Sequence, residues 1–266
     1  MCVIIYYKQN NNNILIKNRD TKHIPNIQII HEIINNIEIV YMHDILTDWI
    51  EGINEYGFSI INSSLNYKSG QLINNTNYEQ KNKSKIIYLS ALLNCSINKF
   101  QDSIIDQSYS NDLSLQGHNI YGTPYFCAHI ESFTNIKPII NILNTQTVFT
   151  NHGIHLKNVE NPQWTISSTI RKNIIENELN NNKINTYSNL LDLLNINYNH
   201  IDTIYHPYRC NEVYTSSQLL MDLNNKIFIF NYDINKCDYM GIINKLPINY
   251  QPKIKIFINK ISKKLI

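Results

Sequence analysis

Cys2 is the residue of this 266-residue chain whose type and position could most directly do covalent chemistry. Removal of Met1 would leave a cysteine that carries both a thiol and a free α-amine. An unperturbed α-amine has a pKa of roughly 8, so much of it is neutral near physiological pH and can accept a proton. One residue would then supply nucleophile and base, as in N-terminal nucleophiles. A cysteine that is buried or merely tolerated at position two is the alternative for this residue taken alone.

The tetrapeptide Lys17-Asn18-Arg19-Asp20 could assist that thiol. It follows a second apolar run, and in a hairpin begun at Cys2 the far end of the second strand returns beside the N-terminus. A nearby cation lowers the pKa of a thiol, and a carboxylate can hold an α-amine in place. Neighbouring residues of a strand point to opposite faces, so Arg19 and Asp20 both reach one thiol only at a bend or bulge. A solvated Arg-Asp turn is the alternative.

The remaining motifs give little support to metal or cofactor chemistry. His152 and His155 are three residues apart and could share a helical face, but no acidic or cysteine partner stands at metal-ligand spacing. We interpret His152 as a pocket residue or a hydrogen-bonded structural residue. The sequence predicts neither a metal nor a cofactor.

Apolar patterns indicate the elements that must position these residues. β-rich runs between polar turn residues predict strands, the first two of which form a hairpin that begins at the second residue. Strands are expected at 3–7, 14–16, 27–30, 37–41, 58–61, 125–130, 139–143, 147–150, 212–216, 219–222 and 227–231.

Apolar residues at helical spacing predict helices at 84–93, 97–105, 168–179 and 187–194, with Ser167 or Ser168 as N-cap of the third. The polar segments 71–85 and 108–122 are expected to be loops at the mouth of a cleft. Strands, two helical blocks and strands again predict an α+β layered sandwich of sheets and helices.

Composition predicts a single globular domain over residues 1–266, because 43% hydrophobic and 17% charged residues can bury a core. A net charge of +2 without a long basic stripe gives no support to nucleic-acid binding. No stretch approaches the ~20 apolar residues of a membrane span. Five cysteines without a C-x-x-C pair are typical of a reducing compartment, so a cytoplasmic protein is expected.

Five short motifs, in the same order along the chain, resemble those of N-terminal nucleophile (Ntn) hydrolases. Met1-Cys2-Val3-Ile4-Ile5 with Asn18-Arg19-Asp20 resembles the start of the Asn-Arg-Asp-Glu family. Four later motifs resemble segments of choloylglycine hydrolases, penicillin V acylases and related acyltransferases. They are Glu51-Gly52-Ile53-Asn54-Glu55-Tyr56-Gly57-Phe58, Val148-Phe149-Thr150-Asn151-His152, Ser167-Ser168-Thr169-Ile170-Arg171, and Tyr214-Thr215-Ser216-Ser217 with the hairpin 219–232.

The resemblance implies the Ntn-hydrolase fold, a four-layer αββα sandwich with two antiparallel sheets between helical layers. It also implies an enzyme that cleaves a linear amide C–N bond of an acylated small molecule through a thioester on its N-terminal cysteine. Carried over to matching positions, it makes Cys2 the nucleophile and Asp20 the carboxylate near the α-amine. It makes Asn151 an oxyanion donor and Arg171 the residue that orients the site.

The chain departs from these families beside the nucleophile. The acylases place an arginine three residues before the aspartate, where this chain has Lys17, whereas Arg19 directly precedes Asp20. Either cation could therefore face Cys2. The second oxyanion donor also has several candidates, which are Asn62, Ser63 and Asn66, and His152 is a further candidate for substrate contact.

Two alternatives to hydrolysis stay open: an acyltransferase of the same fold, in which an amine replaces water, and a non-catalytic Ntn-fold binding protein. The expected partner is a small-molecule acyl amide, and a homo-oligomer is compatible with the sequence. Aromatic residues near the expected cleft predict an apolar acyl pocket. They are Tyr67, Tyr78, Tyr121, Tyr125 and Phe126.

Overall fold

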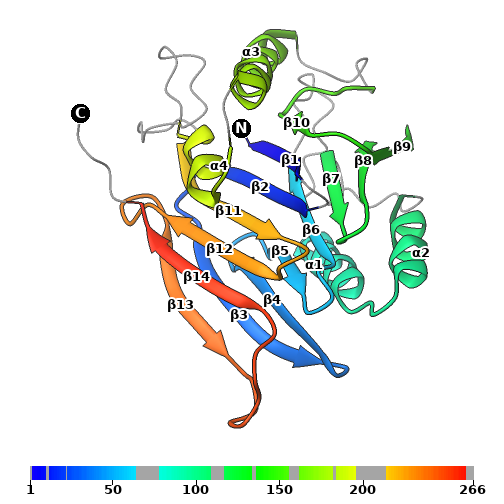
Figure 1. Ribbon diagram of the computed structural model, residues 1–266, viewed down its shortest axis with the longest axis vertical. Helices are drawn as coiled ribbons and strands as arrows, with labels where there is room; N and C mark the ends of the chain where they lie inside the picture. The colour runs from blue at the N-terminus through cyan, green and yellow to red at the C-terminus, as the bar shows by residue number, and fades with distance from the viewer. Residues whose placement is uncertain are drawn as a thin grey trace.

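The computed structural model describes residues 2–9, 12–21, 23–63, 78–108, 117–133, 136–155, 162–181, 184–195 and 214–261. Met1, Asn66, Tyr67 and the parts 71–77 and 109–116 of the two predicted loops lie outside these ranges. Within them, two β-sheets stack on one another, and helices lie against the outer face of each sheet (Figure 1).

The first sheet has six strands and contains the N-terminal hairpin. Its order is β10-β1-β2-β11-β12-β14, so β1 lies between β10 and β2. The strands are β1 (Val3–Gln9), β2 (Asn12–Thr21), β10 (Thr147–Phe149), β11 (Tyr214–Asp222), β12 (Ile227–Tyr232) and β14 (Lys255–Lys260). The hairpin predicted to begin at the second residue is confirmed.

The second sheet has eight strands in the order β13-β3-β4-β5-β6-β7-β8-β9. They are β3 (Asn26–Ile34), β4 (Ile37–Asp44), β5 (Trp49–Asn54), β6 (Ser59–Ser63), β7 (Gly117–Gly122), β8 (Cys127–Phe133), β9 (Ile136–Leu143) and β13 (Asp238–Asn244). Both sheets were predicted to be antiparallel, but each ends in one parallel pair, β12 with β14 and β13 with β3. The chain passes from β12 through β13 before it returns as β14, and a parallel neighbour requires such a crossover.

Alternation along β1 explains how the layers are held together. Val3 and Ile5 pack with Ile175 on the helical side, whereas Ile4 and Tyr6 pack into the core between the two sheets. A third apolar cluster joins the outer face of the eight-stranded sheet to the first two helices. Three clusters thus lie between four layers, and the predicted αββα sandwich is confirmed.

Within the described ranges, two helices cover each sheet. They are α1 (Tyr78–Leu92) and α2 (Ile97–Ser108) on the eight-stranded sheet, and α3 (Pro162–Asn181) and α4 (Tyr187–Leu193) on the six-stranded sheet. None of the described helices combines the length and the apolar character needed to cross a membrane.

Three segments differ from their predictions. Residues 78–85 belong to α1, and residues 117–122 form β7, although both stretches were expected to be loops. Polar composition was misleading in β7, because His118 and Asn119 are buried and find hydrogen-bond partners inside the protein. Helix α3 begins at Pro162, a residue that favours the first helical position, so neither Ser167 nor Ser168 is its N-cap.

Candidate active site

Cys2 precedes β1 at the edge of the core between the sheets, and the strands on either side bring two predicted site residues to it. Strand β1 pairs with β2 through Val3 and Asn18, so the next step of that register sets Cys2 opposite Arg19. Strand β1 also pairs with β10 through Ile4 and Phe149, and continuing that register sets Cys2 opposite Asn151. Opposed residues of antiparallel strands share a face, so all three side chains belong to the inter-sheet side.

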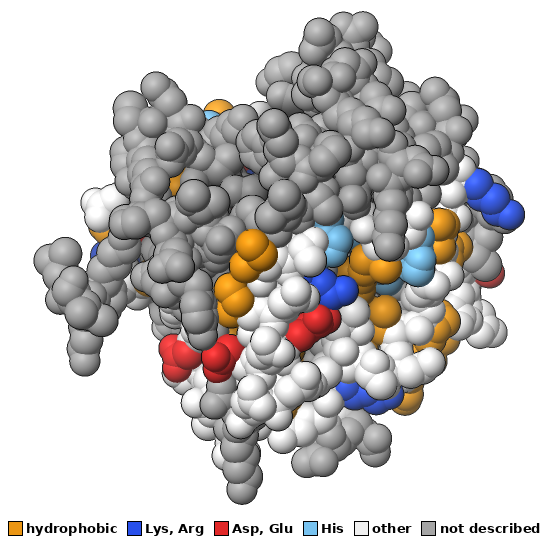
Figure 2. Space-filling model, turned by 90° about the horizontal axis from the view of Figure 1, so that it is seen from above, with side chains coloured by type: hydrophobic (Ala, Val, Ile, Leu, Met, Phe, Trp, Pro, Cys, Tyr) orange, Lys and Arg blue, Asp and Glu red, His pale blue; other side chains and the backbone are white. Residues whose placement is uncertain are grey.

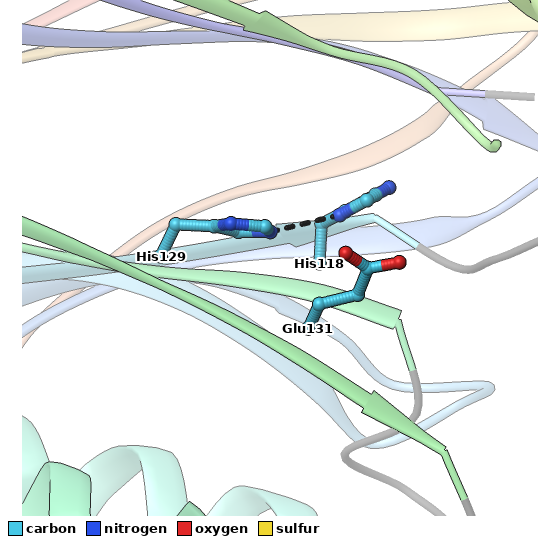
Figure 3. A group of neighbouring side chains, drawn as sticks. All are labelled: His118, His129 and Glu131. Carbon is cyan, nitrogen blue, oxygen red and sulfur yellow. Dashed lines mark hydrogen bonds between the residues drawn. The ribbon is translucent and has the colours of Figure 1, made fainter. Parts of the chain in front are cut away.

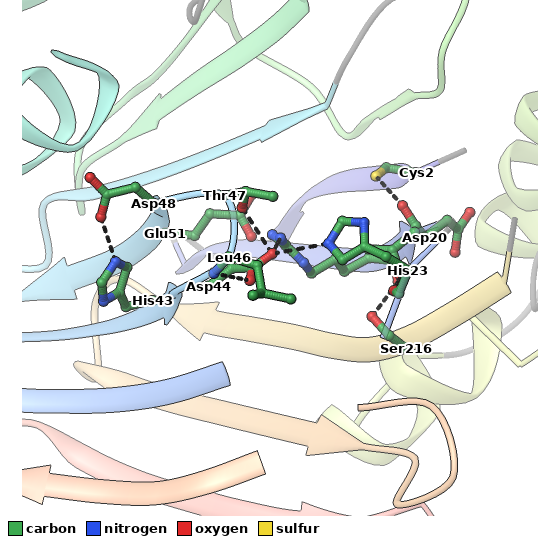
Figure 4. A network of polar contacts seen from close by, with 12 residues as sticks. Cys2, Asp20, His23, His43, Asp44, Leu46, Thr47, Asp48, Glu51 and Ser216 are labelled. Carbon is green, nitrogen blue, oxygen red and sulfur yellow. Dashed lines mark hydrogen bonds and ion pairs between the residues drawn. The ribbon is translucent and has the colours of Figure 1, made fainter. Parts of the chain in front are cut away.

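The thiol of Cys2 is half-buried and contacts the following residue of β2. Its Sγ lies 4.0 Å from the backbone oxygen of Asp20, to which the thiol donates (Figure 4). The carboxylate of Asp20 is buried and accepts a hydrogen bond from Thr215 Oγ1 at 2.7 Å. Asp20 therefore meets Cys2 through its backbone, while its carboxylate is held by β11.

Arg19 bridges the two sheets. Its guanidinium forms an ion pair with Asp44 at the end of β4, with Nη2 2.5 Å from Oδ2. Asp44 is fully buried and also accepts from the backbone N–H of Leu46 and the hydroxyl of Thr47. The ion pair with Asp44 therefore restricts the long side chain of Arg19 and fixes the position of its guanidinium.

A bulge lies beside Arg19, on the neighbouring strand β11 and not on β2 itself. The register of β11 against β2 shifts between Thr215 and Ser217, the signature of an extra residue. That residue is Ser216, whose hydroxyl donates to the backbone oxygen of Arg19 at 3.1 Å. Arg19 thus keeps its direction toward the other sheet.

Lys17 lies two residues before Arg19 on the same face of β2, further from Cys2. Its register partner on β1 is Ile4, and its ammonium forms a buried ion pair with Glu51 of β5. It also lies 3.5 Å from the side-chain oxygen of Asn62. Of the two cations left open by the sequence, Arg19 is therefore the one that the register sets opposite Cys2.

Asn151, Arg171 and Ser63 form a buried chain of hydrogen bonds. The side-chain nitrogen of Asn151 donates to Ser63 Oγ at 3.2 Å, and Arg171 Nη2 donates to the oxygen of the same amide at 3.4 Å. The amide therefore points its oxygen toward α3 and its N–H groups toward the inter-sheet side. This orientation suits a donor that must face a developing negative charge.

The other candidates for an oxyanion donor differ in the hydrogen bonds that their side chains already make. The side-chain nitrogen of Asn62 donates to the hydroxyl of Tyr88 at 2.9 Å, so its amide is already used within the core. His152 directs its Nδ1 at Thr150 Oγ1 and Ser168 Oγ, at 2.8 and 3.0 Å. Burial lowers the pKa of His152 to about 4, which keeps the ring neutral at physiological pH. Ser63 is the candidate that contacts Asn151.

The motif at residues 51–57 has a structural explanation. Asn54 closes the β5–β6 turn, because its side-chain oxygen accepts the backbone N–H groups of Tyr56 and Phe58. Gly57 has a φ of +80°, and a Cβ there would lie 2.0 Å from the backbone oxygen of Leu223. The motif thus fixes the β5–β6 hairpin, and Ser63 is the last residue of β6.

Sequence reasoning missed a buried group formed by His118, His129 and Glu131 (Figure 3). His118 Nδ1 lies 2.9 Å from His129 Nε2, and Glu131 accepts the backbone N–H groups of Ile154 and His155. Burial lowers the pKa of both imidazoles, that of His118 to about 4. The available signal was His-x-Glu on a strand, a spacing that places both side chains on one face.

The predicted aromatic acyl pocket is wrong for three of its five members. Tyr121 and Phe126 pack with the helices on the outer face of the eight-stranded sheet, and Tyr125 is exposed in the β7–β8 turn. That turn lies at the opposite end of β7 from His118, whose partner on β6 is Ser63. Of the other two, Tyr67 lies outside the described residues and Tyr78 begins α1, where its side chain is not described.

Exposed apolar side chains occur instead beside Asp44, the ion-pair partner of Arg19, and just before β3. Ile45 and Leu46 follow Asp44 directly, and Ile24 precedes β3; all three are exposed by 41–53%. The backbone of Ile45 is bonded to that of Asn26, which joins the two turns. Figure 2 looks onto the end of the molecule near α3, where apolar, acidic, basic and histidine side chains lie close together among the described residues.

The four layers, with two stacked sheets between helices, define a fold. The chain has the Ntn-hydrolase fold in the form found in choloylglycine hydrolase-type proteins. A variant of conjugated bile acid hydrolase from Clostridium perfringens matches 98% of this chain and 100% of its own, with a TM-score of 0.50 and 12% identity. Penicillin V acylase from Agrobacterium tumefaciens matches 98% of this chain and 95% of its own, with a TM-score of 0.52 and 11% identity.

No protein-family model and no curated protein matches the sequence. The likeness to solved structures therefore rests on the arrangement of the chain in space, and it shows the fold.

Proposed function

We propose that this protein is an amidohydrolase that cleaves a linear amide C–N bond of an acylated small molecule through a thioester on Cys2. The observation that carries the proposal is the position of Cys2 before β1, between Arg19 on one neighbouring strand and Asn151 after the other. A nucleophile, a cation and a buried amide donor then share one side of one sheet. This is the set of groups that acyl transfer through a thiolate requires.

In the first half-reaction, the α-amine exposed by loss of Met1 accepts the thiol proton of Cys2. The thiolate attacks the substrate carbonyl carbon and forms a C–S bond, and the carbonyl oxygen becomes an oxyanion. The side-chain N–H of Asn151 donates to that oxyanion, and Ser63 is the candidate for the second donor. When the intermediate collapses, the C–N bond breaks and the leaving nitrogen takes the proton from the α-ammonium.

In the second half-reaction, water attacks the thioester carbon and gives its proton to the same α-amine. The C–S bond then breaks, the acid is released, and the thiol regains its proton. Arg19 provides positive potential beside the sulfur, and Asp44 holds it there. Arg171 fixes the orientation of Asn151 by donating to its side-chain oxygen.

Exposed apolar side chains near Asp44, the partner of Arg19, support a proposal for the substrate class. The exposed side chains of Ile24, Ile45 and Leu46 offer apolar contact on that side of the molecule. An apolar acyl or aryl-acyl group is therefore proposed to be bound, with a small amine or an amino acid as the leaving group.

The test is a screen of N-acyl amino acids, phenoxyacetyl amides and fatty-acyl amides for release of free amine. Activity should rise with apolar acyl size and vanish in Cys2→Ala. The matched control is Cys95→Ala, because Cys95 is exposed at a distance from this hairpin. Amine release that is equal in wild type and Cys2→Ala would overturn the proposal.

A second readout separates the alternatives of the same fold. Glycine or another small amine added to the assay would intercept the thioester in an acyltransferase and yield a new amide. Substrate binding without release of amine would mark a non-catalytic binding protein.

A further inference from the structure

The group formed by His118, His129 and Glu131 combines three metal-ligand side chains on two adjacent strands. In the register of β7 and β8, His118 pairs with Glu131, and His129 pairs with Ile120, two residues further along. Alternation puts all three on the inter-sheet face. One ligand atom from each lies within 4.8 Å of the other two, and the three residues are at most 1% exposed (Figure 3).

Hydrogen bonds fix which nitrogen of His118 is available. Its Nε2 lies 2.9 Å from the backbone oxygen of His152, which can only accept, so Nε2 carries the proton. The lone pair of Nδ1 therefore faces His129. An imidazole whose far N–H is held by a carbonyl is the arrangement that orients histidine ligands of metal ions.

Glu131 supports the same interpretation. Each carboxylate oxygen accepts one backbone N–H, from Ile154 and His155, at 3.0 and 2.9 Å. These bonds hold the carboxylate in place, and a carboxylate oxygen that accepts a backbone N–H can also bind a cation through its other lone pair.

We propose that His118 Nδ1, His129 Nε2 and one oxygen of Glu131 bind a zinc ion. Two imidazoles and one carboxylate suit zinc, with the fourth tetrahedral position taken by water. Magnesium and calcium are disfavoured, because they prefer oxygen ligands. Zinc would replace the hydrogen bond between the rings, and the proton on His129 Nε2 would move to Nδ1. The two ligand nitrogens would separate from 2.9 Å to about 3.3 Å, as zinc–nitrogen bonds of ~2.0 Å require.

The site would support the residues proposed to stabilise the oxyanion. His118 pairs across β6 and β7 with Ser63, and it holds the backbone of His152. Asn151 lies between these contacts, since it precedes His152 and donates to Ser63. A metal ion here would therefore stabilise the positions of Ser63 and His152 on either side of Asn151, without contact with the reacting atoms.

The test measures zinc binding by the full-length protein in a Cys2→Ala background, so that the proposed catalytic thiol does not compete. After removal of metal with chelator, zinc content is determined by mass spectrometry of the dialysed protein, and cobalt(II) is added to a second sample. Variants His129→Gln and Glu131→Gln remove one ligand each. His31→Gln is the matched control, because His31 is also buried and lies 2.8 Å from a carboxylate oxygen, that of Glu38.

The expected result is one zinc ion per chain and a cobalt absorption spectrum typical of tetrahedral nitrogen and oxygen ligands. Affinity should fall at least tenfold in His129→Gln and in Glu131→Gln, and it should be unchanged in His31→Gln. If one variant does not fold, the other still decides the question. No zinc uptake by the parent protein, or uptake that neither ligand variant weakens, would overturn the proposal.

Discussion

Asn151 follows β10 at the position that the β1–β10 register sets opposite Cys2. Its amide is buried and held at both ends, with Ser63 on its nitrogen and Arg171 on its oxygen. A donor with a fixed direction costs little reorganisation when charge develops on a substrate. The side chain beside the proposed nucleophile is thus already oriented for that task.

We expect Asn151→Ala to lower kcat by about 10²- to 10³-fold, the usual effect of losing one oxyanion donor. The matched control is Asn13→Ala, which removes a buried amide at the far end of the hairpin that begins at Cys2, where it donates to the backbone oxygen of Thr123. The control should lower the free energy of unfolding with little change in kcat. Equal loss of kcat in both variants would assign Asn151 to the structure alone.

A second prediction concerns the ion pair of Arg19 and Asp44. Arg19→Ala should lower the free energy of unfolding by roughly 3 kcal/mol, because it leaves the buried carboxylate without its cation. Adding Asp44→Asn should restore part of that loss. Urea denaturation of the single and double variants measures both effects.

The control for this ion pair is Lys172→Ala, which breaks the more exposed pair with Glu176 on α3 and should cost less than about 1 kcal/mol. If Arg19→Ala costs no more than the control, the bridge between the sheets does not hold Arg19.

A third prediction compares the rates at which the cysteine thiols react with iodoacetamide. Burial raises the pKa of the Cys127 and Cys237 thiols to about 12, so both should resist iodoacetamide near pH 7. Cys95 is exposed, whereas Cys2 is half-buried and lies opposite Arg19 in the extended β1–β2 register. Cys2 should be labelled faster than Cys95 despite its lower exposure, because a nearby cation favours the thiolate. Peptide mapping after brief labelling gives the order, and slower labelling of Cys2 would argue that its thiol is not activated.

A fourth prediction concerns pH and the turn that follows Asp44. Burial lowers the pKa of His43, against the opposing effect of its hydrogen bond to Asp48. The unfolded chain then binds more protons, so stability is fully present above pH ~6.5 and falls as pH is lowered. His43→Gln should reduce this slope by at most about 1.4 kcal/mol per pH unit. Urea denaturation at pH 7, 6 and 5 checks it, and identical slopes in both proteins would contradict it.

The layers were predictable because β1 and β2 contain continuous β-rich apolar runs separated by polar turn residues, and because the hairpin begins at Cys2. Strand β7 was not, because His118 and Asn119 are polar in sequence yet are satisfied by partners on other strands and helices. Composition records polarity, and only tertiary contacts decide whether a polar residue is buried.

The candidate site also has residues that the sequence predicted and residues that only the structure identified. Motif resemblance identified Cys2, Asp20, Asn151 and Arg171 as a set, and the strand registers bring Cys2 and Asn151 together. The sequence could not decide between Lys17 and Arg19, because the decision depends on which strand position lies opposite Cys2. Asp44 was missed for a similar reason, since its contact with Arg19 crosses from one sheet to the other.

The most direct test of the account is to trap the covalent intermediate. The mature protein is mixed with an apolar acyl amide, the reaction is quenched with acid within its first turnovers, and the N-terminal peptide is analysed by mass spectrometry. We predict a peptide that begins at Cys2, lacks Met1 and carries the acyl group on its thiol, with a burst of amine of about one equivalent. A peptide that retains Met1 and carries no acyl group, while amine is still released, would contradict the account.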